Sequence, residues 1–476
     1  MKKAQFGMVG LGVMGRNLAL NVERNGFRVA VWNREKEWVQ DFLQSKSQGK
    51  RITGTRTIEE FVGTLEKPRR IMMMIKAGPP VDWTIDLLRP HLALGDLLID
   101  GGNSYFPDTV RREAALAKEG LKFFGVGVSG GETGALWGPS MMPGGEKEAY
   151  QALRPIFEKM AAKTEDGACV AYCGPNGAGH FVKMVHNGIE YGDMELIAEA
   201  YQLMKKGLGL SSGEMAQIFS RWNRGLLESF LIEITSKILT VRDERTGHPL
   251  VDKVLDKAGQ KGTGKWASQV ALDLGVAIPT IHASIEARFL SSLKGERVAA
   301  SRAMKGPAAR FQGDKEDFIQ CIHDALYASK ICSYAQGMAL IKAGSDHFKW
   351  GIELSEMARI WKAGCIIRAR LLQKIQQAYR EQADLPNLLM DPHFRNWVLE
   401  SQPRWRKTVV TGQQMGLPLP AMSASLAYFD TYRTANLPLN LTQAQRDFFG
   451  SHTYQRTDDP GGAFIHTDWI GITGEV

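Results

Sequence analysis

The sequence is poor in cysteine and has no long apolar run. Its five cysteines, at positions 169, 173, 321, 332 and 365, include no C-x-x-C pair, which argues against a disulfide framework and a zinc cluster. No stretch offers 18 uninterrupted apolar residues, so we expect no membrane-spanning helix. The start of the chain is interrupted by glycines and lacks an A-x-A cleavage site, unlike a signal peptide. The expected compartment is the cytosol.

Long blocks of like charge are also missing. The sequence has no run of five or six basic residues and no recognisable nucleic-acid module, so we expect no nucleic-acid partner. Its 59 Lys and Arg residues exceed its 51 Asp and Glu residues, giving a net charge of +8. Such a charge favours anionic partners. It is equally compatible with an ordinary basic surface, and a small anionic substrate would need only a local cluster of cations.

Glycine is in excess, with 50 in 476 residues against an average of about 7%, and its positions carry the first motif. Residues 4–9 form an apolar run typical of a buried strand, residues 16–24 have a helical pattern, and residues 27–32 are typical of a second strand. The G-x-G-x-x-G sequence between the first strand and the helix is therefore a dinucleotide-binding fingerprint. The predicted cofactor contacts there are Gly10, Leu11, Gly12, Val13, Met14 and Gly15.

The end of the second strand reports on the cofactor. An acidic residue there accepts hydrogen bonds from the ribose of NAD, whereas an arginine accommodates the 2′-phosphate of NADP. The residues are Asn33, Arg34 and Glu35. Arg34 favours NADP over NAD, although Glu35 would repel a 2′-phosphate if it pointed inward. The alternative is an Arg–Glu pair on the surface.

Polar or glycine-rich clusters follow three further apolar runs. The run 71–75 ends at Ile75 and is followed by Lys76 and Ala77, and we expect these three residues at the cofactor. Asn103 follows the run 97–100, and Ser129 follows the run 123–128. Ligands bind at the carboxyl ends of parallel strands, so Asn103 and Ser129 are candidates to contact a substrate beside the nicotinamide. Either residue alone is equally typical of a turn.

The strand pattern stops near residue 179, and segments with helical periodicity continue to about residue 435. Two blocks recur in the same order: Phe181–His186 resembles Phe318–His323, and Glu214–Phe219 resembles Glu356–Trp361. This pattern indicates a duplicated helical unit. Residues that both copies share are expected to serve packing, and residues that only one copy has are candidates for chemistry.

At two positions of the repeat, the first copy has a lysine or a glutamate and the second copy does not. Lys183 corresponds to Gln320 and Glu190 to Tyr327, whereas His186 corresponds to His323 and is therefore expected to be partly structural. On a helix, Lys183, His186, Asn187 and Glu190 share one face, with Tyr191 at its edge. A desolvated lysine loses its proton readily and can act as a general base. The alternative is a solvated charged face.

Together these motifs resemble the 6-phosphogluconate dehydrogenase (decarboxylating) family over essentially the whole chain. The resemblance rests on VGLGVMGRNLALN from Val9, DGGNSYFPDT from Asp100, GVGVSGGETGALWGPSMMPGG from Gly125, KMVHNGIEYGDM from Lys183, AGQKGTGKW from Ala258 and RDFFGSHTYQR from Arg446. It implies the pentose phosphate pathway reaction, in which 6-phosphogluconate and NADP⁺ give ribulose 5-phosphate, CO₂ and NADPH without a metal. In that reaction Lys183 is the general base and then acid, and Glu190 protonates C1 as the ketose forms.

The resemblance also implies how the substrate is held. Its carboxylate and hydroxyl end is assigned to Asn103, Ser129, Gly130, Gly131, His186 and Asn187. Its phosphate is assigned to Tyr191, Lys261, Thr263, Arg288, Arg446 and His452. The residues around 260–265 form a glycine-rich basic loop, which by itself suits an anion. Arg446 and His452 are implied to come from the partner of a homodimer, whose tail reaches into the neighbouring site.

The expected architecture is an α/β Rossmann-type NADP-binding domain (1–178), an all-helical domain with an internal repeat (179–435) and a C-terminal tail (436–476). Two rival functions remain open. Another β-hydroxyacid dehydrogenase should lack the 261–263 loop, the second helical copy and the 446–452 block, all of which are present. A non-catalytic NADP-binding scaffold should have lost Lys183 or Glu190, and both are present.

Overall fold

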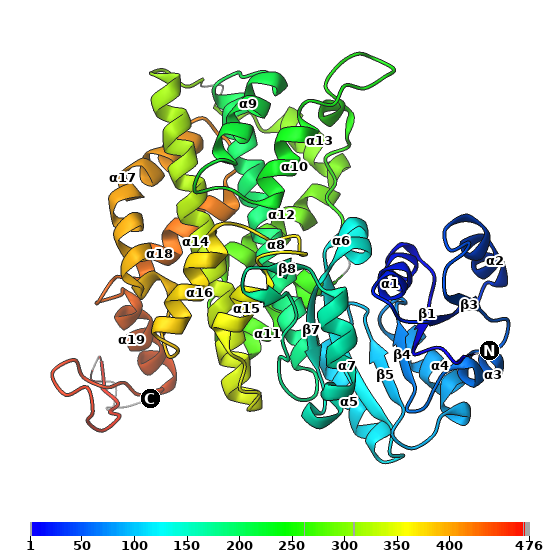
Figure 1. Cartoon of the computed structure of the whole chain (residues 1–476). Helices are drawn as coiled ribbons and strands as arrows, with labels where there is room; N and C mark the ends of the chain where they lie inside the picture. The colour runs from blue at the N-terminus through cyan, green and yellow to red at the C-terminus, as the bar shows by residue number, and fades with distance from the viewer. Residues whose placement is uncertain (1, 261, 308–309, 470, 472–476) are drawn as a thin grey trace. The chain divides into compact units, whose positions relative to one another are not determined.

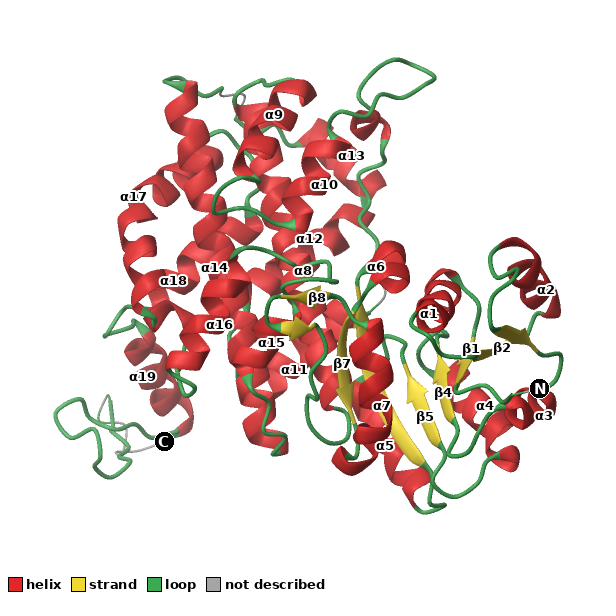
Figure 2. Cartoon of the chain, in the orientation of Figure 1, coloured by secondary structure: helices red, strands yellow, loops and turns green. Residues whose placement is uncertain are grey.

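A computed structural model describes residues 2–260, 262–307, 310–469 and 471. The chain forms two compact units, Met1–Ser425 and Leu426–Val476. The first unit contains a sheet with its flanking helices, followed in the sequence by a long series of helices (Figures 1 and 2). The predicted fold class, a Rossmann-type α/β half followed by a large helical half, is confirmed.

The sheet has seven strands in the order β3-β2-β1-β4-β5-β6-β7, all parallel except β7, which runs antiparallel to β6. The strand order reverses between β1 and β4, and this reversal opens a crevice for a ligand at their carboxyl ends. The strands are β1 (Phe6–Val9), β2 (Val29–Trp32), β3 (Ile52–Gly54), β4 (Arg70–Met73), β5 (Leu97–Asp100), β6 (Lys122–Ser129) and β7 (Ser140–Gly144); a separate pair, β8 (Lys163–Thr164) and β9 (Gly167–Ala168), follows.

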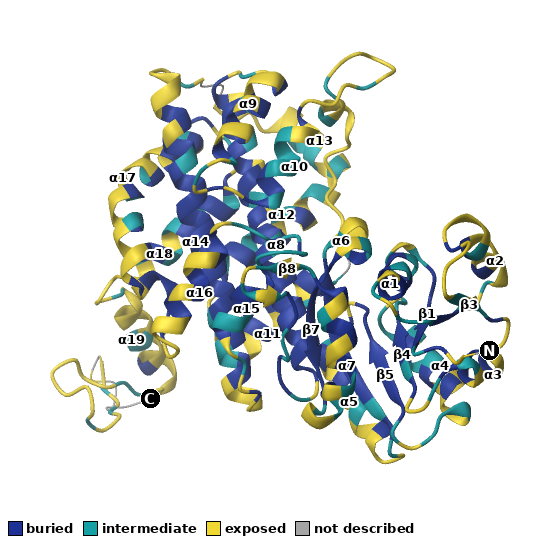
Figure 3. Cartoon of the chain, viewed as in Figure 1, coloured by how far each residue is buried: buried dark blue, intermediate teal, exposed yellow. Residues whose placement is uncertain are grey.

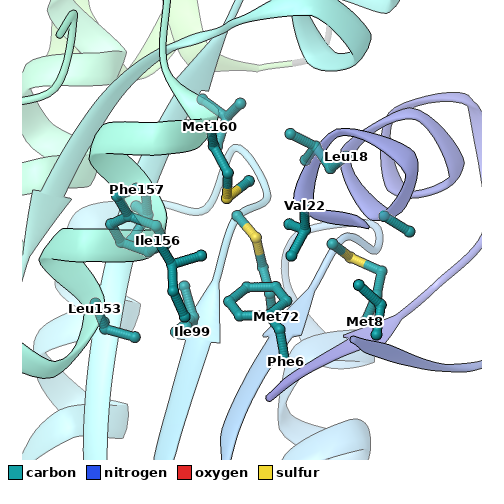
Figure 4. Packing of buried hydrophobic residues seen from close by; sticks show 14 of the residues in the cluster. Phe6, Met8, Leu18, Val22, Met72, Ile99, Leu153, Ile156, Phe157 and Met160 are labelled. Atoms are coloured by element: carbon teal, nitrogen blue, oxygen red, sulfur yellow. The ribbon is translucent and has the colours of Figure 1, made fainter. Parts of the chain in front are cut away.

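Helices cover both faces of the sheet because its strands are apolar on both sides. One core contains Phe6, Met8 and Met72 with side chains of α1 and α7, as Figure 4 shows. Residues of the opposite parity, such as Ile71 and Met73, pack with α3, α4 and α5 on the other face. The helices of this half are α1 (Val13–Arg24), α2 (Lys36–Ser45), α3 (Ile58–Thr64), α4 (Pro79–Leu88), α5 (Phe106–Ala117), α6 (Gly131–Trp137) and α7 (Lys147–Met160).

Two long helices form the centre of the helical half, and most of their residues are buried (Figure 3). These are α8 (Ala178–Gln202) and α14 (Lys315–Phe348). Gly179 lets α8 approach the sheet closely, because a Cβ there would lie 2.2 Å from the carbonyl oxygen of Met142 in β7. The remaining helices are α9 (Ser212–Trp222), α10 (Phe230–Ile238), α11 (Thr263–Asp273), α12 (Pro279–Ser292), α13 (Lys294–Ala303), α15 (Leu354–Ile360), α16 (Leu371–Glu381), α17 (Pro392–Gln414), α18 (Pro420–Tyr432) and α19 (Leu439–Gly450).

The predicted repeat corresponds to two similar series of helices. A long helix, α8, is followed by α9 and α10, and a second long helix, α14, is followed by α15 and α16. Each of the two equivalent histidines contacts a tryptophan of the other copy: the ring of His186 lies 5.6 Å from that of Trp361, and the ring of His323 lies 5.6 Å from that of Trp222. Both contacts are edge-to-face, which supports the expectation that the histidine at this position is partly structural.

Three features bear on the compartment and cofactor expectations. The five cysteines are buried and carry free thiols. Among the residues that the structure describes, no helix is long and apolar enough to cross a membrane. Within the same described ranges, no three His, Cys, Asp or Glu side chains are grouped so that they could hold a metal ion.

Candidate active site

The polar stripe on α8 faces a cavity instead of open solvent. Lys183 is 5% exposed and Asn187 7%, and the Glu190 side chain is 19% exposed. The stripe lies against the carboxyl end of β6, where Gly127 leaves room for the lysine: a Cβ on Gly127 would lie 2.4 Å from the Cβ of Lys183. Burial of these ionisable groups is costly unless they serve a purpose, so the alternative of a solvated charged face does not describe this helix.

A cavity of about 650 Å³ opens between the sheet and the helical half. It brings together predicted residues that are far apart in the sequence. They come from α1, from the segments at the carboxyl ends of β5 and β6, and from α8, α11 and α12. The predicted residues lining it are Met14, Asn103, Ser129, Gly130, Gly131, Lys183, Asn187, Glu190, Tyr191, Thr263 and Arg288. The spacing rules and the resemblance therefore converge on one place in the fold.

His186 is fully buried behind this lining. Its Nε2 lies 3.1 Å from the Ser129 hydroxyl. Its Nδ1 lies 3.2 Å from Oδ1 of Asn187 and 3.4 Å from Nζ of Lys183. Burial holds the pKa of His186 well below its usual value, and the charge of Lys183 lowers it further. The ring is therefore neutral, and it orients three cavity residues without lining the cavity itself.

The pKa values of Lys183 and Glu190 in the cavity shift in opposite directions. Burial lowers the pKa of Lys183, while the nearby charge of Glu190 opposes that shift. Burial raises the pKa of Glu190, with Lys183 and Arg288 acting against it. Both shifts favour the uncharged forms, namely a lysine amine and a glutamic acid. The two shifts thus favour a base and an acid side by side in one cavity.

The opposite end of the cavity is built for an anion. The guanidinium of Arg288 stacks on the ring of Tyr191, with its Cζ 3.6 Å from the ring centroid, and donates to the carbonyl of Gly259 at 3.0 Å. Thr263 is the first residue of α11 and accepts a hydrogen bond from the Asn187 amide at 3.1 Å. A helix N-terminus beside an arginine suits a phosphate. Lys261, which we also expect here, lies outside the described residues.

The glycine fingerprint has the geometry that dinucleotide binding requires. Gly10 ends the first strand with φ of +93°, and a Cβ on Gly15 would lie 1.9 Å from the Gly10 carbonyl oxygen, so α1 begins directly against the turn. Gly12 caps α1, and no atom lies within 4 Å of the position its Cβ would take. The Leu11 N–H donates to Oδ1 of Asn33 at 2.8 Å, which ties the ends of β1 and β2 together. The helix N-terminus thus stays open to a pyrophosphate.

Comparisons with known proteins agree with the family resemblance of the sequence motifs. A family model for the NAD binding domain of 6-phosphogluconate dehydrogenase matches residues 5–174, and one for the C-terminal domain of 6-phosphogluconate dehydrogenase matches residues 179–469. The chain belongs to the 6-phosphogluconate dehydrogenase family.

Relatives match the chain from end to end. The decarboxylating 6-phosphogluconate dehydrogenase of Synechocystis sp. is 55% identical over 474 residues, covering 99% of this chain and 98% of that protein. The NADP(+)-dependent, decarboxylating enzyme of Bacillus subtilis is 54% identical over 99% of this chain and 100% of its own length. The solved Plasmodium falciparum 6-phosphogluconate dehydrogenase superposes with a TM-score of 0.94 at 43% identity, covering 98% of this chain and 100% of that one.

In this member of the family, Arg34 and Glu35 are paired with each other. Nε and Nη2 of Arg34 donate to the Glu35 carboxylate at 2.9 and 2.7 Å, and the arginine side chain is 84% exposed. Asn33 also donates to that carboxylate, at 2.9 Å. The surface pair that the sequence left open as an alternative is therefore formed. After β4, on the other side of β1, Ile75 and Ala77 are half-buried and Lys76 is exposed.

The remaining two predicted residues of the 6-phosphogluconate dehydrogenase site, Arg446 and His452, belong to the C-terminal unit. Arg446 lies exposed on α19 and donates to Gln443 at 3.0 Å, and the exposed His452 packs its ring edge-on against Phe449. This unit is organised around Asp447, whose carboxylate accepts hydrogen bonds from the Thr453 N–H and the Trp469 indole at 2.9 Å each.

Sequence reasoning missed several residues that line the cavity. These are Val128, Met194, Gly259 and Ile366, whereas Gln260, which also lines it, belongs to the predicted basic loop. Ile366 comes from the second helical copy, and its N–H lies 3.4 Å from the Ser129 hydroxyl. The only signal was the Gly364–Cys365 pair before it. A Cβ on Gly130 would lie 2.6 Å from the Gly364 carbonyl oxygen and a Cβ on Gly364 would lie 2.6 Å from the Gly138 carbonyl oxygen, so neither position has room for a side chain.

Proposed function

We propose that this chain catalyses the oxidative decarboxylation of 6-phosphogluconate with NADP⁺, giving ribulose 5-phosphate, CO₂ and NADPH in the pentose phosphate pathway. The observation that carries the proposal is one cavity that holds Lys183 and Glu190 with opposed pKa shifts beside an anion-binding end. The Bacillus subtilis relative is NADP(+)-dependent, and the Plasmodium falciparum structures include complexes with NADP⁺ and with 6-phosphogluconate.

The residues of the glycine turn fit the cofactor. The open N-terminus of α1 at Gly12 suits the pyrophosphate, and Arg34 suits the 2′-phosphate once it leaves Glu35. Ile75, Lys76 and Ala77 follow β4, which is next to β1, and Asn103 follows β5; all four suit the nicotinamide half. When bound there, NADP⁺ supplies the acceptor for the hydride from C3 of the sugar acid.

Lys183 moves the protons at C3. Its neutral amine takes the proton of the C3 hydroxyl as the hydride leaves, and the resulting ammonium then polarises the C3 oxygen while CO₂ is lost. The lowered pKa of Lys183 supports the first role, since a larger fraction of the amine is then neutral. The Lys183 ammonium gives its proton to the C3 oxygen as the enediol forms. Glu190, whose pKa is raised, then donates the proton that C1 needs, and the Lys183 amine takes back the hydroxyl proton as the ketose forms.

The two ends of the cavity orient the substrate between these groups. Asn103, the Ser129–Gly131 turn and Asn187 suit the carboxylate and hydroxyls, with His186 holding Ser129 and Asn187 in place. Tyr191, Thr263 and Arg288, together with Lys261, suit the phosphate. A doubly anchored substrate places C3 against Lys183, and such positioning supplies much of an enzyme's rate acceleration.

The proposal includes a homodimer that works in the cytosol. In it the 436–476 tail of each subunit carries Arg446 and His452 to the phosphate end of the partner's cavity, beside the NADP-binding domain (1–178) and the helical domain (179–435). Both side chains are exposed, as donors to another subunit must be. Buried free thiols are in keeping with a reducing compartment.

The test is to measure NADPH and CO₂ together when the purified chain is given 6-phosphogluconate and NADP⁺, with NAD⁺ run in parallel. We expect one CO₂ for each NADPH and a clear preference for NADP⁺. NADPH without CO₂ would instead indicate a β-hydroxyacid dehydrogenase that only oxidises. Failure to reduce either cofactor would favour the non-catalytic scaffold and overturn the proposal.

A further inference from the structure

A second histidine on α8 lies between the catalytic helix and the sheet. His180 comes three residues before Lys183 and is 1% exposed. Its Nε2 lies 3.1 Å from the carbonyl oxygen of Asp100, the last residue of β5, and its Nδ1 lies 2.7 Å from the hydroxyl of Thr109 in α5. Gly125 of β6 makes room for this contact, since a Cβ there would lie 2.7 Å from Nδ1 of His180.

These two partners determine the state of the ring. A carbonyl oxygen can only accept a hydrogen bond, so Nε2 of His180 carries the proton and donates it to Asp100. Burial lowers the pKa of His180, which favours the neutral imidazole. Nδ1 of the neutral ring then accepts from the Thr109 hydroxyl. The ring therefore connects the end of β5 to α8 in one defined orientation.

The side chain of Asp100 holds the loop that carries Asn103. Its Oδ1 accepts from the N–H of Gly102 at 3.0 Å, and its Oδ2 accepts from the hydroxyl of Ser104 at 2.6 Å. The two contacts lie on either side of Asn103 in the sequence, and Asp100 is fully buried. The loop is thus tied to the residue whose carbonyl His180 engages.

Arg112 extends the same network to the loop after β4. It is 2% exposed, and its Nη1 lies 3.7 Å from Oδ2 of Asp100. Its Nη2 donates to the carbonyl of Gly78 at 3.0 Å and to Asp82 at 2.7 Å, and this pairing lowers the pKa of Asp82 to about 2. The loop that ends at Gly78 includes Ile75–Ala77, expected at the nicotinamide. The network therefore links the loop that carries Asn103 with the loop that carries Ala77.

We propose that His180 and Asp100 are positioning residues, which fix the loops around Asn103 and Ala77 relative to Lys183 so that C3 of the substrate and the cofactor are aligned for hydride transfer. This inference rests on the proposed function. Neither residue lines the cavity, so each acts through Asn103 and the helix backbone. Misplacement of reacting groups by about 1 Å can cost on the order of 10²-fold in rate.

Two substitutions at His180 separate positioning from simple packing. The Gln side chain in His180→Gln can place its amide where Nε2 is and still donate to the Asp100 carbonyl. The shorter side chain in His180→Asn reaches only toward Thr109. We expect His180→Asn to lower kcat by about tenfold or more, with KM for 6-phosphogluconate changed far less. We expect His180→Gln to recover most of that loss.

The primary isotope effect with C3-deuterated 6-phosphogluconate gives the decisive readout. Misalignment slows hydride transfer itself, so the isotope effect on kcat should rise in His180→Asn and stay near the wild-type value in His180→Gln. His91→Asn is a matched control, because His91 pairs with Glu59, whose side chain is exposed, and belongs to neither the cavity nor this network. Should His180→Asn fail to fold, the isosteric Thr109→Val removes the Nδ1 partner and should raise the isotope effect in the same direction.

Each other outcome is also decisive. If the wild type is active but His180→Asn and His180→Gln have equal kcat and equal isotope effects, this inference is overturned. The proposed function then still stands. The same holds if Thr109→Val, used in place of an unfolded Asn variant, shows a wild-type isotope effect. A wild type and a His91→Asn control that both fail to form NADPH would instead contradict the proposed function.

Discussion

At the scale of single residues, Lys183 and Glu190 each shift the pKa of the other. The charge of Glu190 raises the pKa of Lys183 against the larger effect of burial, and the charge of Lys183 lowers the pKa of Glu190 in the same way. Activity requires the neutral amine and the protonated acid. It should therefore rise with pH through the lowered pKa of Lys183 and fall through the raised pKa of Glu190.

The raised pKa of Glu190 predicts the behaviour of Glu190→Gln. Activity falls at high pH because Glu190 loses its proton there, and a glutamine has no such proton to lose. We expect overall turnover to drop by about 10²-fold or more, since a general acid is lost, and the basic limb of kcat/KM against pH to disappear. A basic limb that stays in place would show that Glu190 is not the acid that must remain protonated.

Glu35 predicts a change in cofactor preference. Its carboxylate holds Arg34 through two hydrogen bonds and would repel a 2′-phosphate. We expect Glu35→Ser to free the arginine and lower KM for NADP⁺ by about threefold to tenfold, which corresponds to about 1 kcal/mol, with KM for NAD⁺ little changed. Glu37→Ser, on the next turn of the chain, is the control. Unchanged or higher KM for NADP⁺ would show that the Arg34–Glu35 pair does not compete with the cofactor.

The sequence alone could predict the residues whose chemistry follows from spacing. The i, i+3, i+4, i+7 stripe from Lys183 to Glu190 lies on one face of α8, as helical geometry requires. It could not predict Ile366, because an apolar residue from the second copy gives no polar signal. Nor could spacing show that His186 sits behind the cavity, since that depends on how α8 is rotated against β6.

At the scale of elements, the two long helices meet at equivalent positions of the repeat. With His186 aligned to His323, Asp193 of α8 aligns to Lys330 of α14, and these two side chains form an ion pair in which each is 1% exposed. One copy thus supplies the acid and the other the base at the place where α8 and α14 pack. The duplication was readable from the sequence, but this contact between its copies was not.

This buried pair predicts a stability effect. We expect Lys330→Met to lower the free energy of unfolding by about 3–5 kcal/mol, because Asp193 is left as a buried, uncompensated charge. The double variant Asp193→Leu/Lys330→Met should recover much of that loss, since no charge remains. Denaturant unfolding measures both. A single variant as stable as the wild type would mean that the pair does not hold the helices together.

The strands illustrate a second limit of sequence reasoning at this scale. Apolar runs ending in polar clusters predicted β1, β2, β4, β5 and β6 to within a few residues. The antiparallel β7 was not predicted, because its Ser140–Gly144 segment reads as a glycine- and proline-containing turn. It becomes a strand only through its pairing with β6 and the close packing of Gly179.

At the scale of the whole molecule, the proposal depends on two chains sharing each site. A mixture of Lys183→Met and Arg446→Ala subunits tests this directly. If the tail serves the partner, each hybrid dimer contains one site with both residues intact, and random mixing should restore about a quarter of wild-type activity. If the tail serves its own subunit, no hybrid site is complete, and activity should stay as low as in the separate variants.

The central claim is that Lys183 takes the proton that accompanies hydride transfer. The most direct measurement is rapid mixing of Lys183→Met, loaded with NADP⁺, against 6-phosphogluconate while NADPH absorbance is followed, with cofactor and substrate binding verified separately. We predict a folded variant that binds both ligands and forms NADPH slower than the wild type by about 10³-fold or more. NADPH formation at the wild-type rate would contradict the mechanism.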